Sequence, residues 1–299
     1  MQEELIKNQE TESYERKGSG LRKVKDVFHR MKKNKLAMFG LVIIILLVLT
    51  AIFAGFIAPY DYSTNNLKDQ FSGPSKEHLF GTDEFGRDIF SRIVYGSRIS
   101  LQVGFISVGI ALIAGVAIGA VAGFYGGKVD TILMRVIDII QSLPDILLAI
   151  AIMAVLGPGL ANLMIAVGIA AIPGYAKIVR SSVLSIKDSE YVEAAKANGS
   201  SDFRIIIKHI IPNCLAPIIV QATLGVAYAI INAAGLSFIG LGLEPPTPEW
   251  GAMLSGGRAY IRDFPHMTIF PGLAIVITIF ALNVLGDGLR DALDPKLKQ

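Results

Sequence analysis

The chain has 299 residues, of which 52% are hydrophobic and 18% charged, with a formal net charge of +3 and a single cysteine. This apolar share exceeds the roughly 45–50% of ordinary soluble domains, so the composition excludes such a domain and indicates an integral membrane protein. The lone cysteine, Cys214, excludes an internal disulfide. The four histidines lack metal-binding spacing, so no metal site is expected.

The amino-terminal region divides into a tail and a helix. Residues 1–20 are polar and end in Gly-Ser-Gly, which predicts a flexible cytoplasmic tail. Residues 21–35 place apolar side chains at helical spacing among seven lysines and arginines, which predicts a basic amphipathic helix. Such a helix can bind nucleic acid. Directly before a membrane span it more often lies on anionic lipid, so membrane lipid is the expected partner and nucleic acid is not.

Six segments each hold about the 17–25 apolar residues needed to cross a bilayer. They are residues 36–58, 99–123, 136–156, 159–176, 214–243 and 267–286. The first follows too long a charged stretch to be a cleavable signal peptide and is expected to remain as an anchor. The third and fourth are separated only by Gly-Pro-Gly, so one long buried hairpin is the alternative. The predicted fold class is an all-α integral membrane protein, a six-helix transmembrane bundle over 36–290 with a tail over 291–299.

The distribution of positive charge predicts the orientation of this bundle. With the amino terminus in the cytoplasm, the inner segments hold 21 lysines and arginines and the outer segments hold 7. This satisfies the positive-inside rule. Both termini and the elbow over 177–213 are therefore expected on the cytoplasmic side, and the loops over 59–97 and 244–266 on the outer side.

The first outer loop closes with the run Gly81 to Asp88, which contains Asp83 and Arg87. Its acids do not match the spacing of a calcium-binding loop. An apolar stripe from Ile89 to Val94 follows, which predicts a helix lying on the outer surface. The second outer loop is stiffened by prolines and holds the only tryptophan, Trp250, which is either an interfacial anchor or a partner contact.

Glycines and prolines mark two of the spans. Gly115, Gly119 and Gly123 recur at intervals of four in the second span, which predicts close packing of one helix face against a neighbour. Pro173-Gly174 predicts a kink in the fourth span.

The third span contains Arg135, Asp138 and Asp145, and ionisable groups at membrane depth are functional candidates because an unpaired charge there is costly. Arg135 and Asp138 can pair at i, i+3, and Pro144 breaks the helix beside Asp145. A structural role and the carboxylate of a proton-coupled carrier both remain open. No histidine or second buried acid accompanies Asp145 in a relay.

A polar stretch from Glu190 to Asn213 separates the fourth and fifth spans. Asp188 or Ser189 can cap a short helix that a left-handed Gly199 ends, and a second helix is expected over 203–211, before Pro212. Tyr191, Val192 and Ala195 are expected on one side of the first helix. Ala194 and Ala195 offer a face that another backbone can approach closely, and Glu193 can pair with Lys196. This helix-turn-helix elbow is predicted as a docking element.

The spacing of Glu193-Ala194-Ala195, Gly199 and Pro212 resembles the EAA signature of ABC importer permeases. His209 and Ile211 depart from the broad pattern, although His209 and Pro212-Asn213 resemble the peptide-importer branch. Three further stretches agree with that branch, namely residues 78–88, 246–251 and 283–295. The resemblance covers roughly residues 25–295 and is closest to the second, C-type permease subunit of dipeptide and oligopeptide importers.

The resemblance implies a type I ABC importer permease in a bacterial or archaeal cytoplasmic membrane. Its implied partners are a second homologous permease, two cytoplasmic ATP-binding subunits and an extracytoplasmic solute-binding protein. The elbow would be the coupling helix that docks an ATPase subunit, through Tyr191, Val192, Glu193, Ala194, Ala195, Ala197, Asn198 and Gly199. Asp83, Arg87 and Trp250 are candidate outer partner contacts.

The chain is not expected to be an enzyme or to bind a cofactor directly. Its only Gly-Lys dipeptide, Gly127-Lys128, lacks the pattern of a phosphate-binding loop, so ATP and Mg²⁺ would be used by the partner subunits. Peptide is the expected substrate, with nickel chelates, glutathione or short sugars as alternatives. A self-sufficient secondary carrier that uses Asp138 or Asp145 is the alternative from another class.

Overall fold

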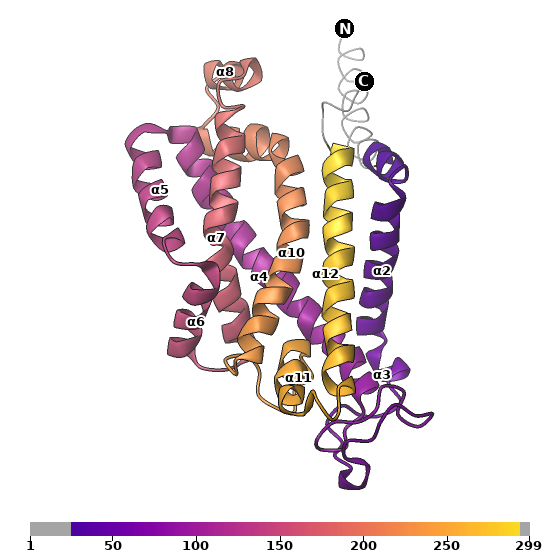
Figure 1. Ribbon diagram of the computed structural model, residues 1–299. Helices are drawn as coiled ribbons and strands as arrows, with labels where there is room; N and C mark the ends of the chain where they lie inside the picture. Colours follow the sequence, from indigo (N-terminus) through magenta and orange to yellow (C-terminus); the bar gives the residue numbers. More distant parts are fainter. Residues whose placement is uncertain (1–24, 294–299) are drawn as a thin grey trace.

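The computed structural model describes residues 25–293, which form helices and connecting loops with no β-strand (Figure 1). The predictions for residues 1–20 and for the last six residues of the chain lie outside the described part. Residues 25–31 of the predicted basic helix are helical. The α-helices that follow are α2 (Lys35–Ile52), α3 (Ala54–Ile57), α4 (Ile89–Tyr125), α5 (Gly127–Gln141), α6 (Asp145–Leu156), α7 (Leu160–Leu184), α8 (Glu190–Ala197), α9 (Asp202–Ile205), α10 (Leu215–Phe238), α11 (Trp250–Gly257) and α12 (His266–Leu293).

The long helices confirm the predicted all-α membrane fold. Helices α2, α4, α7, α10 and α12 are each long and apolar enough to cross a membrane, and α5 and α6 meet the same criterion only when taken together, with a bend of 82° between them. The bend confirms the expected break at Pro144, which occupies the cap position of α6 and has no N–H to continue the hydrogen-bond ladder of α5.

Helix α4 differs from the prediction of a separate surface helix before the second span. The stripe from Ile89 to Val94 forms the first turns of one continuous helix of 37 residues. The Asp88 carboxylate caps this helix by accepting a hydrogen bond from the Ser91 N–H at 2.7 Å. No proline interrupts the chain between this cap and Tyr125, so the outer stripe and the span share one axis.

The packing of α4 against α7 is the most extensive helix pair in the bundle and confirms the role expected of the spaced glycines. A Cβ atom on Gly119 would lie 2.4 Å from the Ala176 carbonyl oxygen, and one on Gly115 would lie 2.4 Å from the Tyr175 Cβ. The two backbones approach this closely only because these positions have no side chain.

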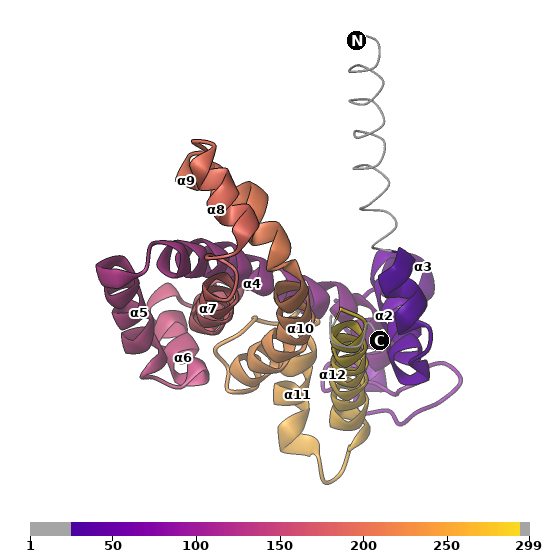
Figure 2. The same ribbon diagram turned by 90° about the horizontal axis from the view of Figure 1, so that it is seen from above.

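The two ends of the bundle carry different structures (Figures 1 and 2). Helices α8 and α9 project beyond the bundle at one end, termed the α8 end. The long segment 59–88, together with α3 and α11, covers the opposite end, termed the α11 end. Helices α2 and α12 lie side by side along one flank, and α5 and α6 form the opposite flank. The α8 end holds the predicted docking elbow.

Candidate functional site

Helix α8 is held in a defined elbow by its two ends. Ser189 takes the cap position in extended backbone conformation. At the other end Gly199 has a φ of +72°, its N–H donates to the Lys196 carbonyl at 2.9 Å, and the Ser200 N–H donates to the Ala195 carbonyl at 3.1 Å. These two bonds form the Schellman motif, in which a left-handed glycine ends a helix. The predicted left-handed stop at Gly199 is confirmed.

The two faces of α8 have different surroundings, and this corrects part of the predicted docking set. Val192 is 0% exposed and Ala195 is 8% exposed, and both pack in an apolar cluster with Ile205 and Ile210 of the returning chain. They anchor α8 and are not available to a partner. The remaining predicted docking residues are exposed, namely Tyr191, Glu193, Ala194, Ala197, Asn198 and Gly199. Tyr191, one turn before Ala195, is exposed beside this buried pair.

The returning half of the elbow is less regular than predicted. The helix expected over 203–211 is an α-helical turn, α9, followed by a π-helical turn over Ile206–Ile210 and a 3-10 turn over Ile211–Asn213. Pro212 accounts for this, because it cannot donate to the ladder and its ring crowds the preceding turn.

The expected Glu193–Lys196 pair is also absent. Lys196 Nζ lies 5.5 Å from the ring centroid of Phe124, and Glu193 forms no ion pair within residues 25–293. The carboxylate of Glu193 is therefore free to face a partner.

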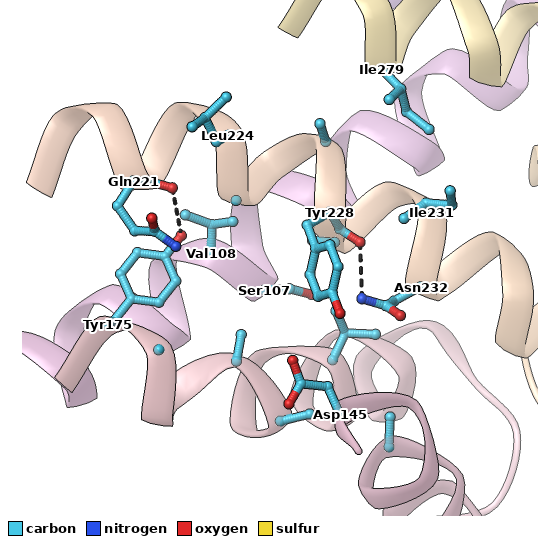
Figure 3. Close-up of a pocket in the computed structure, with 18 of the residues that line it drawn as sticks. Ser107, Val108, Asp145, Tyr175, Gln221, Leu224, Tyr228, Ile231, Asn232 and Ile279 are labelled. Carbon is cyan, nitrogen blue, oxygen red and sulfur yellow. Dashed lines mark hydrogen bonds between the residues drawn. The ribbon is translucent and has the colours of Figure 1, made fainter. Parts of the chain in front are cut away.

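A cavity of about 550 Å³ lies within the bundle among α4, α6, α7 and α10, with its edges on α12 and on the last residue of α5 (Figure 3). Most of its lining is apolar or small. The polar side chains that line it are Ser107, Gln141, Asp145, Tyr175, Gln221, Tyr228, Asn232 and Asn283. A mostly apolar cavity with a few convergent polar groups has the composition of a small-ligand site.

Helix α10 supplies the polar face of this cavity. Gln221, Tyr228 and Asn232 are spaced by seven and four residues, which places them on one side of a helix that is otherwise largely apolar. The Tyr175 hydroxyl of α7 donates to the Gln221 carbonyl at 3.3 Å, and the Asn232 amide donates to the Tyr228 carbonyl at 3.1 Å. These residues were not predicted from the sequence, although their helical spacing within an apolar span was a usable signal.

The three candidate intramembrane residues separate in the structure. Asp145, the first residue of α6, lines the cavity, and the Tyr228 ring extends toward it (Figure 3). Arg135 and Asp138 do not line it. The expected Arg135–Asp138 pair is wrong, because the Asp138 carboxylate pairs with Lys177 Nζ of α7 at 2.7 Å.

A second ion pair joins the same two helices. The Arg180 guanidinium of α7 donates to the Asp130 carboxylate of α5, with Nη2 and Oδ2 2.6 Å apart. Together with the Lys177–Asp138 pair, this bidentate contact holds α5 against α7. Asp138 therefore has a structural partner, and it lies outside the cavity.

Two of the candidate partner contacts at the α11 end, Asp83 and Arg87, are buried and bind each other. Asp83 and Arg87 are 6% and 5% exposed, and their carboxylate oxygen and Nε lie 2.6 Å apart. The other Asp83 oxygen accepts from the Phe85 and Arg87 N–H groups. Arg92 then donates to the Tyr62 and Pro246 carbonyls at 2.9 and 3.1 Å, which joins the two loops. This buried network braces the loops, so Asp83 and Arg87 are corrected from partner contacts to structural residues.

Trp250 is likewise neither an interfacial anchor nor a partner contact. Its side chain is 1% exposed, and its indole Nε1 donates to the Ile93 carbonyl of α4 at 3.1 Å. Glu249 directly before it caps α11, accepting from the Gly251 and Ala252 N–H groups at 2.9 and 2.8 Å. Burial of the Glu249 carboxyl raises its pKa above the usual range. Trp250 therefore belongs to the core at the α11 end.

We expect Trp250→Ala to lower the free energy of unfolding by about 3–5 kcal/mol, because it removes a large buried side chain. Trp250→Phe should cost less, since it keeps most of the buried area and loses the hydrogen bond to Ile93. Thermal unfolding in detergent, followed by circular dichroism, measures both effects. An unchanged Tm in Trp250→Ala, combined with lost binding of an outer partner, would return Trp250 to the contact residues.

Long apolar helices around a cavity with a few convergent polar groups, with a polar elbow projecting from one end, define a multi-pass transport permease. Residues 115–299 match the family of binding-protein-dependent transport system inner membrane components, and residues 24–74 match the N-terminal transmembrane domain of oligopeptide transport permease C. The chain belongs to this family of ABC importer permeases. Within it, the match over residues 24–74 assigns the chain to the C-type permeases of the peptide branch.

Similar proteins cover nearly the whole chain. The dipeptide transport system permease protein DppC of Alkalihalophilus pseudofirmus is 52% identical over 92% of this chain and 90% of its own length. The glutathione transport system permease protein GsiD of Escherichia coli is 47% identical over 91% and 90%. The di/tripeptide permease DppC of Pseudomonas aeruginosa is 44% identical over 92% and 93%.

A solved structure shares the fold. The inward-facing MetNI methionine ABC transporter gives a TM-score of 0.57 at 20% identity, over 69% of this chain and 98% of that chain. The match supports the importer-permease fold alone. Because the chain belongs to the importer-permease family, the alternative hypothesis of a self-sufficient secondary carrier is not retained.

Proposed function

We propose that this chain is one of two permease subunits of an ATP-driven importer of short peptides in a bacterial or archaeal cytoplasmic membrane. One observation carries the proposal: a single chain combines an exposed docking helix at one end with a cavity inside the bundle that holds a few convergent polar groups. The first feature suits an element that receives motion, and the second suits a path for a polar solute. Relatives that transport dipeptides, di/tripeptides and glutathione support a short peptide as the solute.

The α8 end faces the cytoplasm in this proposal, as the distribution of lysines and arginines favours. Two separate ATP-binding subunits hydrolyse ATP with Mg²⁺, and one of them receives α8 through the exposed residues from Tyr191 to Gly199. The α11 end faces outward toward a solute-binding protein. The second, homologous permease packs against the open side of the cavity and completes the path. Because the separate ATP-binding subunits hydrolyse ATP, this chain performs no catalysis in the proposed assembly.

Affinity purification of this chain from mildly solubilised membranes tests the assembly. We expect mass spectrometry to find a second permease and ATP-binding subunits in the same complex, and the complex to hydrolyse ATP. Purification of this chain without any such subunit, from membranes in which its neighbouring genes are expressed, would contradict the proposal.

We expect Glu193→Lys to reduce recovery of the ATP-binding subunits by at least about tenfold, because it reverses an exposed charge at the centre of the docking face. Glu77→Lys is the matched control, since it makes the same reversal on an exposed residue at the α11 end. Quantitative mass spectrometry of the two purified complexes gives the ratio. Equal recovery from both variants would remove Glu193 from the docking face.

A further inference from the structure

The intramembrane cavity contains one carboxylate and no basic side chain. Among the residues that line it, Asp145 is the only aspartate or glutamate, and no lysine, arginine or histidine is present. The other polar groups are neutral amides and hydroxyls. The break between α5 and α6 that carries Asp145 lies near the middle of the bundle's length (Figure 1). The cavity therefore presents a single carboxyl group at membrane depth.

This carboxylate has no cationic partner within the part of the chain that the structure describes. The two cations of α7 pair with other carboxylates, Lys177 with Asp138 and Arg180 with Asp130. The amino terminus of α6 favours a negative charge at Asp145 through the helix dipole. The dipole does not supply a counter-charge inside the cavity, and an unpaired charge in such surroundings is costly.

We propose that Asp145 is a specificity-determining residue that binds the ammonium group at the amino terminus of the transported peptide. This inference rests on the proposed peptide function and deepens it. A short peptide of any sequence carries a terminal ammonium, so one carboxylate serves a range of side chains. An ammonium offers three donors, and the Asp145 carboxylate and the Tyr228 hydroxyl that faces it are acceptors on opposite walls.

The remaining lining fits the rest of such a ligand. A cavity of about 550 Å³ lies within the range of small-ligand pockets, roughly 300–1,000 Å³. The amides of Gln141, Gln221 and Asn283 can both donate to and accept from peptide groups. Because this lining holds an acid and no base, it distinguishes the amino end of a peptide from the carboxyl end.

The test compares alanyl-alanine with N-acetyl-alanyl-alanine, which lacks the ammonium. Equilibrium binding of each radiolabelled peptide is measured on the complete importer in nanodiscs, without nucleotide and without the solute-binding protein, so that only the permease pathway contributes. We expect the free-amine peptide to bind at least about tenfold more tightly, as a desolvated ion pair provides, and Asp145→Asn to remove this preference. Asp138→Asn, which changes an acid outside the cavity, should keep it.

Two further variants separate the charge from the position on α6. Asp145→Glu should retain the preference for the free amine. The double variant Asp145→Asn with Asn232→Asp, which moves the carboxylate to the α10 wall, should recover part of it. Equal affinity for both peptides in the wild type, binding of neither, or a preference that survives Asp145→Asn would overturn the proposal. A failure of the peptide function itself would appear separately, as absent ATP-dependent peptide uptake by the wild-type importer.

Discussion

Replacing Gly199 with proline is expected to abolish ATP-driven transport while leaving the chain in the membrane. Gly199 has a left-handed backbone, and its N–H closes the carboxyl end of α8 by donating to the Lys196 carbonyl. Proline fixes φ near −65° and has no N–H, so it loses both features at a local cost of about 3 kcal/mol. Without this turn the chain leaves α8 in a different direction, and the exposed face of α8 no longer contacts the ATP-binding subunit in the proposed assembly.

Gly199→Asn is the matched control, because asparagine adopts the left-handed conformation more readily than other residues with a side chain. No atom outside the adjoining chain lies within 4 Å of a Cβ built at this position, so the larger side chain has space. We expect Gly199→Asn to retain most uptake and Gly199→Pro to lose at least about tenfold. Uptake in Gly199→Pro at the wild-type level, with equal amounts in the membrane, would refute the role of the elbow in coupling.

Gly119→Leu is expected to prevent assembly of the bundle. A Cβ at this position would lie 2.4 Å from the Ala176 carbonyl oxygen and 2.9 Å from the Arg180 backbone nitrogen. Both contacts are backbone atoms of α7, so no side chain can rotate away, and the two helices must separate. Overpacking of a core costs typically about 1–3 kcal/mol even where side chains can adjust, and the cost here exceeds that range.

The control for Gly119→Leu lies on the same helix. Gly109 also belongs to α4, but no atom lies within 4 Å of a Cβ built there beyond its own helix. Gly109→Leu therefore makes the same chemical change without the clash. The yield of monodisperse protein in detergent and its Tm report both variants. A Tm for Gly119→Leu that matches Gly109→Leu would show that α4 and α7 do not pack as described.

The sequence was sufficient for the fold because each apolar run had to form a helix to satisfy its backbone in a bilayer. It also located the elbow, since Gly199 and Pro212 restrict the backbone directly. The continuity of α4 was missed because an amphipathic stripe looks the same whether it starts a long helix or lies on a surface. The partners of Asp138 and Lys196 were missed because the spacing of residues along one helix identifies local pairs only. It does not show whether a residue on another helix binds more favourably.

The site was only partly predictable, for a similar reason. Asp145 could be selected as a costly charge at membrane depth, but its place in a cavity depends on how α6, α7 and α10 pack. The burial of Val192 and Trp250 follows from contacts with chain segments distant in sequence. The family resemblance suggested a partner contact at Val192 and the residue type suggested one at Trp250, whereas burial assigns both to the core.

Uptake of radiolabelled alanyl-alanine by proteoliposomes tests the central proposal most directly. The vesicles hold this chain with its co-purified subunits, ATP and Mg²⁺ are supplied on the side of α8, and the solute-binding protein is supplied on the other side. We predict accumulation of peptide that requires both ATP and the binding protein and that Gly199→Pro abolishes. Peptide accumulation by this chain alone, without ATP or partner subunits, would contradict the account.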